Sequence, residues 1–306
     1  MAVKIAVVGS SNTDMIIKVP RIPKPGETVL GGRFSTASGG KGANQAVAAA
    51  RAGAEVCFIA RVGDDMFAEA ALEGFSADGI DISGVRRDPS APSGVALIFV
   101  AEDGENSIAV ASGANANLSA DDVNTARSTI ESADILLTQL ETPQESVRAA
   151  VKIASDAGVK VILNPAPAQP LDDALMPQLD VLTPNEYEAN RLTGIQVSGE
   201  SSAAAAAAAL RRKGVGCVLI TLGSRGVYMD GDEKSGLVPA YSVKAVDTTA
   251  AGDVFNGTLA VALAEGRTLD ESVRFASAAA ALSVTKLGAQ PSAPSRAEID
   301  KMLSKK

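Results

Sequence analysis

The sequence predicts an α/β protein, a three-layer sandwich around a central, mostly parallel β-sheet, with a small β-sheet lid. Short runs of apolar and β-branched residues alternate with longer helical patterns, which is typical of parallel sheets covered by helices on both faces. Two segments, 26–35 and 94–110, interrupt this alternation with strand-like patterns that have no helix beside them. The chain of 306 residues is longer than one average domain, so a body with an appendage is expected.

Strands and helices of the predicted body alternate along the chain. β-Branched runs predict strands at residues 4–8, 56–60, 135–140, 159–163, 181–183 and 217–221. Helical spacing predicts helices at residues 44–53, 66–75, 120–132, 143–157, 186–192, 201–213, 254–265, 269–284 and 296–303. Ser119 is a typical N-cap for the third of these helices, and Gly158 and Gly214 follow the ends of two others.

The two interrupting segments predict a second, small sheet. Residues 94–110 have the pattern of a β-hairpin around a polar turn at 102–105, and residues 26–35 combine alternation with glycines. We therefore expect a lid formed by residues 12–38 and 93–112, and a body formed by residues 1–11, 39–92 and 113–306. Such a lid would expose an apolar face unless it covered a ligand or paired with another subunit, which favours a homodimer joined through the lid.

The composition excludes several classes of function. The chain has no histidine, which removes imidazole bases, Ser-His-Asp triads and histidine-bound zinc. Its net charge of −8 disfavours nucleic-acid binding, and no apolar run reaches the ~18 residues that a membrane helix needs. Cys57 and Cys217 lie in apolar runs typical of buried strands, and the amino terminus lacks a signal-peptide core, so we expect a cytoplasmic protein. Any catalysis must use carboxylates, lysines, hydroxyls, backbone amides or a hard metal ion.

Polar residues collect where the predicted parallel strands end, which is the edge where such sheets bind ligands. Asn12 and Asp14 follow the first strand, and the further residues at strand ends are Glu141, Asn164, Asn185 and Gly223. Loops are polar in most proteins, so any single position carries little weight, but the repetition favours a site. Asn12 and Asp14 are two residues apart, so an extended chain would point both to one side. An amide beside a carboxylate can hold vicinal hydroxyls, which predicts a polyol ligand.

A glycine-rich segment at residues 38–44 opens a predicted helix. It is not a Walker A loop, because Gly42 follows Lys41 where that motif has Ser or Thr, and it lacks the spacing of a dinucleotide-binding motif. Gly40 offers bare backbone to a ligand, while Lys41 and Asn44 offer hydrogen-bond donors at the start of the helix. The segment predicts a ligand site, although an ordinary turn would also contain such glycines.

The segment 247–257 gives the strongest functional signal. Its run Ala250, Ala251 and Gly252 leads directly into an apolar helix and would leave the first amides of that helix unshielded. Such amides and the helix dipole favour an anion, and the adjacent carboxylate of Asp253 suits phosphoryl transfer as the base that accepts a hydroxyl proton. An ordinary N-cap aspartate is the alternative. The dipole should also lower the pKa of Asp253 and keep its carboxylate ionised.

These motifs, in their order and spacing, resemble the pfkB family of carbohydrate kinases and, within it, the ribokinases. The matching pieces are GSSNTD (9–14), PGET (25–28), GGKGANQAVAAAR (39–51), QLE (139–141), NPAPA (164–168), TPNE (183–186), TLGSRG (221–226), DTTAAGDVFNG (247–257) and GAQPS (288–292). The resemblance implies a ribokinase-like fold with a β-sheet lid, and ATP-dependent phosphorylation of a sugar's primary hydroxyl with Mg²⁺. In a ribokinase the sugar is D-ribose, whose 5-hydroxyl receives the phosphoryl group to give D-ribose 5-phosphate.

The resemblance also implies roles for individual residues. The implied sugar site comprises Asn12, Asp14, Gly40, Lys41, Asn44 and Glu141. The implied catalytic base is Asp253, beside an anion hole formed by Ala250, Ala251 and Gly252. The implied ATP contacts are Asn185, Thr221, Gly223, Ser224, Gly226, Gly252, Asn256 and Ser277. Ribokinases often carry a larger side chain than serine at the last of these positions. Glu188 is implied to organise Mg²⁺ through water, and the implied K⁺ site comprises Asp247, Thr249, Ser283, Lys286, Gly288 and Ser292.

Other activities stay open on the sequence alone. A related kinase of the family would act on 2-deoxyribose, another sugar or a nucleoside, and a non-catalytic sugar sensor would keep the same fold. Lys41 is the one basic residue among those implied to bind the sugar, which argues against a phosphorylated hexose. The presence of Gly252 and Asp253 argues against a sensor.

Overall fold

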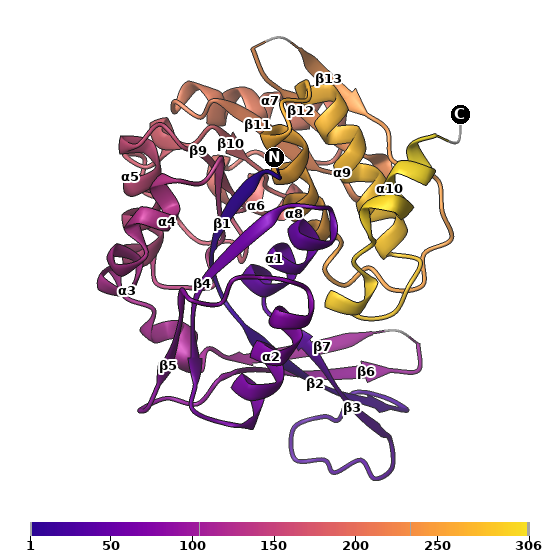
Figure 1. Ribbon diagram of the computed structural model, residues 1–306. Helices are drawn as coiled ribbons and strands as arrows, with labels where there is room; N and C mark the ends of the chain where they lie inside the picture. The colour runs from indigo at the N-terminus through magenta and orange to yellow at the C-terminus, as the bar shows by residue number, and fades with distance from the viewer. Residues whose placement is uncertain (1, 104, 233, 305–306) are drawn as a thin grey trace.

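A nine-stranded, mostly parallel sheet runs through the centre of the protein, and a separate four-stranded sheet lies at the lower end of the view in Figure 1. The computed structural model describes residues 2–103, 105–232 and 234–304. The predicted fold class, an α/β body with a small second sheet, is confirmed by this architecture.

The order of strands in the large sheet is β13-β12-β11-β10-β9-β8-β1-β4-β5. Its parallel strands are β1 (Lys4–Val8), β4 (Glu55–Gly63), β5 (Val85–Asp88), β8 (Ile135–Thr138), β9 (Lys160–Leu163), β10 (Val181–Leu182) and β11 (Cys217–Thr221). An antiparallel edge follows, formed by β12 (Val227–Asp230) and β13 (Ser235–Val238). Strand β1 lies between β4 and β8, so the strand order reverses there. Open α/β sheets bind ligands beyond the carboxyl ends of strands at such a reversal.

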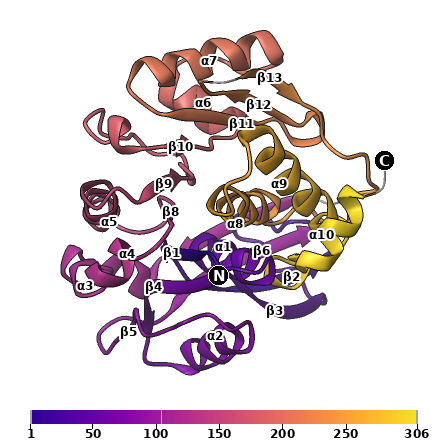
Figure 2. The same cartoon turned by 45° about the horizontal axis from the view of Figure 1, so that its top comes forward.

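Alternate residues of β1 face two different hydrophobic cores, which makes the body three layers deep. Ile5 and Val7 pack with α1 (Lys41–Arg51), α2 (Met66–Ala77), α8 (Ala251–Ala264), α9 (Leu269–Ser283) and α10 (Arg296–Leu303). Ala6 and Val8 pack with α3 (Ala120–Thr125), α4 (Arg127–Glu131), α5 (Gln144–Asp156), α6 (Glu186–Thr193) and α7 (Glu200–Arg212). Figure 2 shows α8 to α10 and α3 to α5 on opposite sides of the sheet.

The small sheet has the order β3-β2-β6-β7. Its strands are β2 (Asn12–Val19), β3 (Arg33–Gly39), β6 (Gly94–Ala101) and β7 (Asn106–Ala111). The predicted hairpin is confirmed by the antiparallel pairing of β6 with β7; Gly104, in its predicted turn, lies outside the described residues. Strand β2 pairs with both β3 and β6, and it begins at Asn12. The chain therefore passes from the large sheet into the small sheet within four residues of the end of β1.

Several elements differ from the sequence prediction. The predicted helix 120–132 is two helices that meet at Ala126, after the weak helix formers Asn124 and Thr125. Strand β3 occupies residues 33–39 and not the predicted 26–35. Strands β2, β5, β12 and β13 were not predicted, because strands of four residues, or strands open to solvent, have weak hydrophobic patterns.

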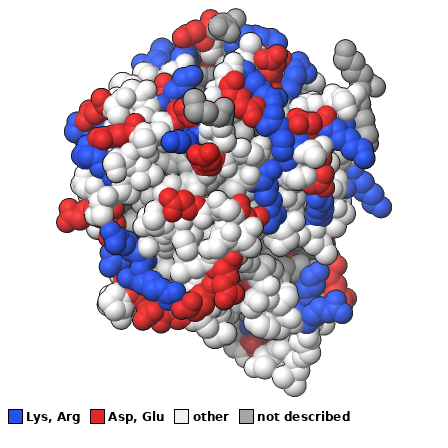
Figure 3. Space-filling model, viewed as in Figure 1, with Lys and Arg blue, Asp and Glu red and all other residues white. Residues whose placement is uncertain are grey.

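Charged residues of both signs are interspersed over the face in Figure 3. The chain forms exposed ion pairs such as Arg87–Glu69 and Lys152–Asp156. None of the helices among the described residues is both long and apolar enough to span a bilayer. Cys57 and Cys217 are buried and free, as predicted.

Helices α1 and α8 cross backbone to backbone at Gly257. A Cβ atom at Gly257 would lie 2.4 Å from the carbonyl oxygen of Gln45 and 2.8 Å from Cβ of Ala48. A real Cβ does not occupy such a space, so only glycine allows this approach. The close crossing brings the amino-terminal turns of both helices together at the edge where β1 ends.

We predict that Gly257→Ala lowers the free energy of unfolding by about 1–3 kcal/mol, because the new methyl group must push α1 away from α8. Urea denaturation measures this change. The matched control is Gly74→Ala in α2, where no described atom beyond the neighbouring backbone of the helix lies within 4 Å of the new Cβ. Alanine forms helices better than glycine by about 1 kcal/mol, so the control should be neutral or stabilising. Equal losses in the two variants would contradict the close crossing.

Candidate functional site

A polar pocket of about 200 Å³ lies beyond the carboxyl ends of the parallel strands. Its lining comes from α1, the ends of β9 to β11, α6 and the start of α8. The lining residues are Lys41, Asn164, Ala166, Thr183, Asn185, Glu188, Thr221, Thr248, Ala250, Ala251, Gly252, Asp253 and Asn256. Most of them belong to the motifs that the sequence singled out.

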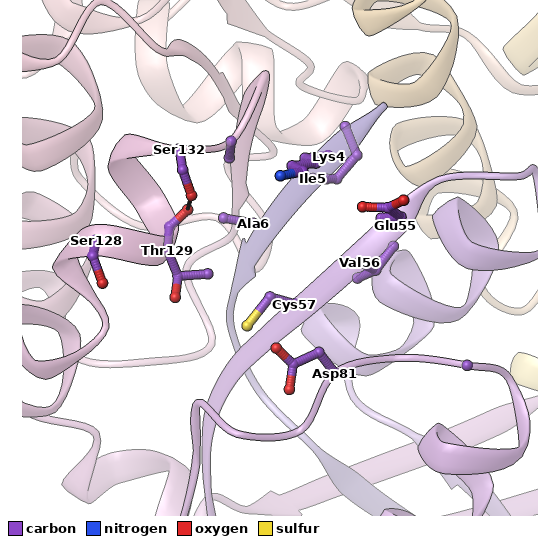
Figure 4. Close-up of a pocket in the computed structure, with 12 residues that line it drawn as sticks. Lys4, Ile5, Ala6, Glu55, Val56, Cys57, Asp81, Ser128, Thr129 and Ser132 are labelled. Carbon is purple, nitrogen blue, oxygen red and sulfur yellow. Dashed lines mark hydrogen bonds between the residues drawn. The ribbon is translucent and has the colours of Figure 1, made fainter. Parts of the chain in front are cut away.

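A larger hollow, of about 560 Å³, lies at the opposite end of the sheet (Figure 4). Its lining includes Lys4 and Glu55, which are the first residues of β1 and β4. Burial and the neighbouring Asp81 raise the pKa of the Cys57 thiol there to about 11, so this thiol stays protonated and unreactive near neutral pH. The larger hollow contains none of the residues implied to act in the site, and its end of the strands is the wrong one for ligand binding. The smaller pocket is therefore the candidate site.

The carboxylate of Asp253 is buried at the inner wall of this pocket, with 6% of the residue exposed. Its Oδ2 accepts a hydrogen bond of 2.9 Å from Nδ2 of Asn44, and its Oδ1 accepts one of 3.0 Å from Nε2 of Gln45. Both donors belong to α1. Asn44 was predicted from the sequence and Gln45 was not, because no local pattern sets Gln45 apart from other residues of the helix.

The alternative interpretation of Asp253 as a helix cap does not hold. The N-cap of α8 is Ala250, which makes no side-chain capping bond and has a positive φ of 59°. A non-glycine residue in this left-handed region is strained, and such strain concentrates at functional sites. Asp253 lies three residues into the helix, and its oxygens bond to α1. The first residues of α8 thus line the pocket, and no side chain among the described residues caps their amides; the Ala251 amide donates a 3.3 Å hydrogen bond to the Thr248 carbonyl.

Electrostatics correct one prediction. The helix dipole was expected to lower the pKa of Asp253, but burial raises it, against the opposing effects of Lys41 and the two amide donors. Four carboxylates surround the Lys41 ammonium and raise its pKa, although burial alone would lower it; they are Asp253, Glu141, Glu188 and Asp14. The desolvation of a fully buried carboxylate therefore outweighs the dipole of α8.

The residues implied to bind sugar lie beside Lys41. Oε2 of Glu141 accepts hydrogen bonds from the hydroxyl of Ser10 and from the backbone N–H of Lys41. Oδ1 of Asn12 accepts a 2.8 Å hydrogen bond from Nδ2 of Asn115. Ser10 and Asn115 were missed by the sequence analysis, because their contacts cross about a hundred residues of chain. Gly40 has a φ of 90°, and a Cβ there would lie 2.7 Å from the backbone N of Asn12, so glycine is required.

Asp14 lies on β2 and faces the same cluster. Burial, Glu141 and Asp253 raise its pKa to about 6, and Lys41 only partly opposes them. The carboxylate of Asp14 also lies tightly against β3, since a Cβ at Gly39 would lie 2.5 Å from both of its oxygens. A partly buried carboxylate with such a pKa is typical of functional sites.

The residues implied to contact the nucleotide are only partly brought together. Asn185, Thr221 and Asn256 line the pocket, and Asn185 forms a bridge with Thr221 at the ends of β10 and β11. Asn256 also donates a 2.8 Å hydrogen bond to the carbonyl of Gly252. Outside this lining lie Gly223, Ser224, Gly226 and Ser277. Ser277 is buried in α9, and its hydroxyl has no hydrogen-bond partner among the described atoms.

The residues implied to bind a monovalent cation cluster behind α8. The carboxylate of Asp247 accepts 2.9 Å hydrogen bonds from the backbone N–H groups of Thr249 and Gly288, which ties two loops together. Ser283 and Ser292 are buried near these loops, where each hydroxyl donates to a backbone carbonyl. Lys286 directs its ammonium to Glu298, so only its backbone can face the cluster.

Comparison with known proteins gives the family. The model of the pfkB family of carbohydrate kinases matches residues 2–296. The chain belongs to the pfkB carbohydrate kinase family. It is 49% identical over 294 residues to a ribokinase from Haemophilus influenzae, with 96% of each chain covered. It is 38% identical to a deoxyribokinase from Salmonella typhimurium, with 98% of each covered. Its fold matches a structure of Arabidopsis thaliana ribokinase complexed with ribose and ATP, with a TM-score of 0.92, 36% identity and full coverage of both chains.

We predict that Asp14→Asn stabilises this pfkB kinase at pH 7 by about 1–2 kcal/mol, less than the full pKa shift would give because Asp14 is only partly buried. The folded-state pKa of about 6 lies above the ordinary 3.8, so the folded state binds the proton more tightly. The stability from this proton is present at acid pH and is lost as the pH rises from about 4 to about 6.

Urea denaturation of both proteins between pH 4 and pH 8 tests this prediction. The difference in unfolding free energy should vanish near pH 4 and grow toward pH 7. The matched control is the neutralisation of an exposed carboxylate of α2, Glu73→Gln, which should show no such growth. A difference between Asp14→Asn and the original protein that stays constant with pH would refute the raised pKa.

Proposed function

We propose that this pfkB kinase is an ATP-dependent ribokinase, which transfers the γ-phosphoryl group of ATP to the 5-hydroxyl of D-ribose to give D-ribose 5-phosphate. The observation that carries the proposal is a buried carboxylate, Asp253, beside the uncapped amino terminus of α8. Full-length relatives and a solved structure that carry the name ribokinase support the choice of substrate.

Asp253 acts as the general base. Its raised pKa makes it a stronger proton acceptor than an ordinary aspartate, while Lys41 and the two amide donors from α1 favour its ionised form. As the phosphoryl group moves, its charge is stabilised by the amides at residues 250–252 and by the dipole of α8. Lys41 adds a partly buried positive charge at the same wall of the pocket.

The sugar binds where the small sheet meets the edge of the large sheet, on the residues that the family resemblance implies for it. Asp14 and Glu141 accept hydrogen bonds from sugar hydroxyls, and Asn12, Lys41 and the backbone at Gly40 help to orient the ring. Oδ1 of Asn44 is buried and has no hydrogen-bond partner among the described atoms, so it offers one further acceptor. An acceptor-rich site of this kind favours an uncharged polyol.

The nucleotide occupies the other side of Asp253. Its phosphates lie toward Gly252, Asn185 and Asn256, and the base and ribose lie along the turn after β11 and toward α9. The residues proposed for these contacts are Asn185, Thr221, Gly223, Ser224, Gly226, Gly252, Asn256 and Ser277. The small Ser277 leaves more space at the adenine than a larger side chain would.

The donor set fits Mg²⁺ that is held mainly by phosphates. Among the parts of the chain that the structure describes, no three His, Cys, Asp or Glu side chains gather to hold a metal. Mg²⁺ in kinases needs only one or two carboxylates besides phosphates and water, and Glu188 is a buried carboxylate in the pocket. Glu188 would orient the water molecules of the ion. When bound, Mg²⁺ neutralises charge on the phosphates of ATP.

The cluster behind α8 suits K⁺, which binds carboxylate, carbonyl and hydroxyl oxygens. Its proposed contacts are Asp247, Thr249, Ser283, Lys286 through the backbone, Gly288 and Ser292. The loop that carries Asp247 and Thr249 runs directly into α8. A cation bound there would therefore order the strained turn at Ala250.

We predict that replacing K⁺ by Na⁺ lowers kcat and leaves the ranking of sugars unchanged, because the cluster is separate from the sugar site. Initial rates in matched chloride salts measure the effect. The variant Asp247→Asn should show a smaller difference between the two salts than the original protein. Equal rates in K⁺ and Na⁺ would remove the cation site.

We also propose a cytoplasmic homodimer joined through the small sheet. Both faces of that sheet expose apolar side chains: Ile108 and Val110 lie on the face that carries Asp14, and Phe34 and Leu97 on the other. Pairing of two small sheets would bury such side chains. The free thiols of Cys57 and Cys217 fit a reducing compartment.

ADP release over a panel of sugars tests the proposed function. The protein is assayed with ATP, Mg²⁺ and K⁺ against D-ribose, 2-deoxy-D-ribose, other pentoses, a hexose and a nucleoside. D-Ribose should give the highest kcat/KM. Preference for 2-deoxyribose would favour the function of the Salmonella relative, and no turnover with any sugar would favour a non-catalytic sensor.

We predict that Asp253→Asn lowers kcat by about 10²–10⁴, the usual effect of a lost general base, or about 3–5 kcal/mol. Ribose binding, measured by calorimetry, should survive, because Asn keeps the shape of the side chain. A loss of less than tenfold would show that Asp253 is structural.

A further inference from the structure

Gln45 is a fully buried amide that touches Asp253 but does not line the pocket. Its Nε2 donates to Oδ1 of Asp253 at 3.0 Å and to Oδ1 of Asn164 at 3.2 Å. Asn44 has a free oxygen for the substrate, whereas both ends of Gln45 are engaged by the protein. Gln45 is therefore placed to act on protein groups, the Asp253 carboxylate among them, and not on a substrate.

A second buried amide fixes which end of Gln45 faces the base. Nε2 of Gln139, just beyond the end of β8, donates a 2.7 Å hydrogen bond to Oε1 of Gln45. An amide carries its donors and its acceptor on opposite sides, so this bond turns Nε2 of Gln45 toward the carboxylate. In the reverse orientation Oε1 would face the negative oxygens of Asp253 and repel them.

Burial of the Gln139 side chain costs free energy, and a role in packing alone does not explain why an amide occupies this position. It is fully buried, and its Oε1 has no hydrogen-bond partner among the described atoms. Leaving a buried acceptor unpaired is unfavourable, so an apolar side chain would suit a purely structural position better. Gly9 directly follows β1, and a Cβ there would lie 2.1 Å from this oxygen. Only glycine at this position therefore leaves space for the Gln139 side chain.

The same hydrogen-bonded chain reaches the start of α8. Nδ2 of Asn164 donates to the carbonyl of Thr183, whose hydroxyl donates to Oδ1 of Asn256. Asn256 in turn donates to the carbonyl of Gly252. The chain therefore connects the carboxylate of Asp253 with the backbone turn that carries the proposed anion hole.

We propose that Gln45, locked by Gln139, is a positioning residue that fixes the rotation of the Asp253 carboxylate toward the reacting hydroxyl. This inference rests on the proposed function, because it takes Asp253 as the base. Asn44 holds one carboxylate oxygen and Gln45 the other, so the plane of the carboxylate is set from two sides. Gln45 itself touches neither substrate.

Replacing Gln45 by a side chain of similar length without a donor, Gln45→Met, tests the proposal. We expect kcat for ribose to fall about 10- to 100-fold at pH 7, as for other misplaced catalytic groups, with KM for ATP within about twofold of the original. The acid limb of the pH profile of kcat/KM should move to higher pH by about one unit. The Asp253 carboxylate loses a hydrogen-bond donor, so its pKa rises.

The other charged groups that face Asp253 stay in place in this variant, so they do not cause the shift. They are Lys41 of α1, Asp14 of β2, Glu141 beyond β8 and Glu188 of α6. The control is Thr258→Val, in which a buried hydroxyl of α8 that bonds only to its own helix is lost. This control should lower the melting temperature or leave it unchanged, and the acid limb of the pH profile should stay at the same pH.

Gln139→Met keeps Gln45 and removes only the lock, so it serves as the second variant and carries the test if Gln45→Met does not fold. It should move the acid limb in the same direction by a smaller amount. An unmoved acid limb in the folded variants, with only a lower melting temperature, would overturn the proposal. Absence of ribose turnover in the original protein would instead overturn the proposed function.

Discussion

The burial of one carboxylate against the side of α1 is the constraint on which the rest of the site depends. Asp253 loses its water and gains two amide donors, from Asn44 and Gln45, in return. These hydrogen bonds form because α1 and α8 pack closely together, which the absence of a side chain at Gly257 allows. Because both helices begin near this contact, their packing places Lys41, Asp253 and the first residues of α8 around a single pocket.

Desolvation then sets the chemistry of the whole cluster. Burial raises the pKa of Asp253 and of Asp14, while the four carboxylates around Lys41 hold its ammonium charged. A cluster with three more carboxylates than lysines is costly to the fold without ligands, as expected of a site built for function. Sugar hydroxyls would supply further hydrogen-bond donors to these carboxylates.

The sequence predicted the body of the fold, and most residues that line the candidate pocket belong to motifs that it singled out. What it missed has physical causes. The start of α8 was recognisable, because small residues and an aspartate before an apolar helix are a local signal. The direction of the pKa shift of Asp253 was not, because burial is a property of the folded chain. Gln45, Ser10 and Asn115 act through contacts between distant segments, and no local pattern distinguishes them.

The most direct measurement is a crystal structure of the protein with D-ribose, ADP and a planar metal-fluoride mimic of the phosphoryl group. The account predicts that the mimic lies on the amides at residues 250–252, with O5 of ribose about 3 Å from the carboxylate of Asp253. A mimic bound away from the start of α8, or a ribose whose O5 is out of reach of Asp253, would contradict it.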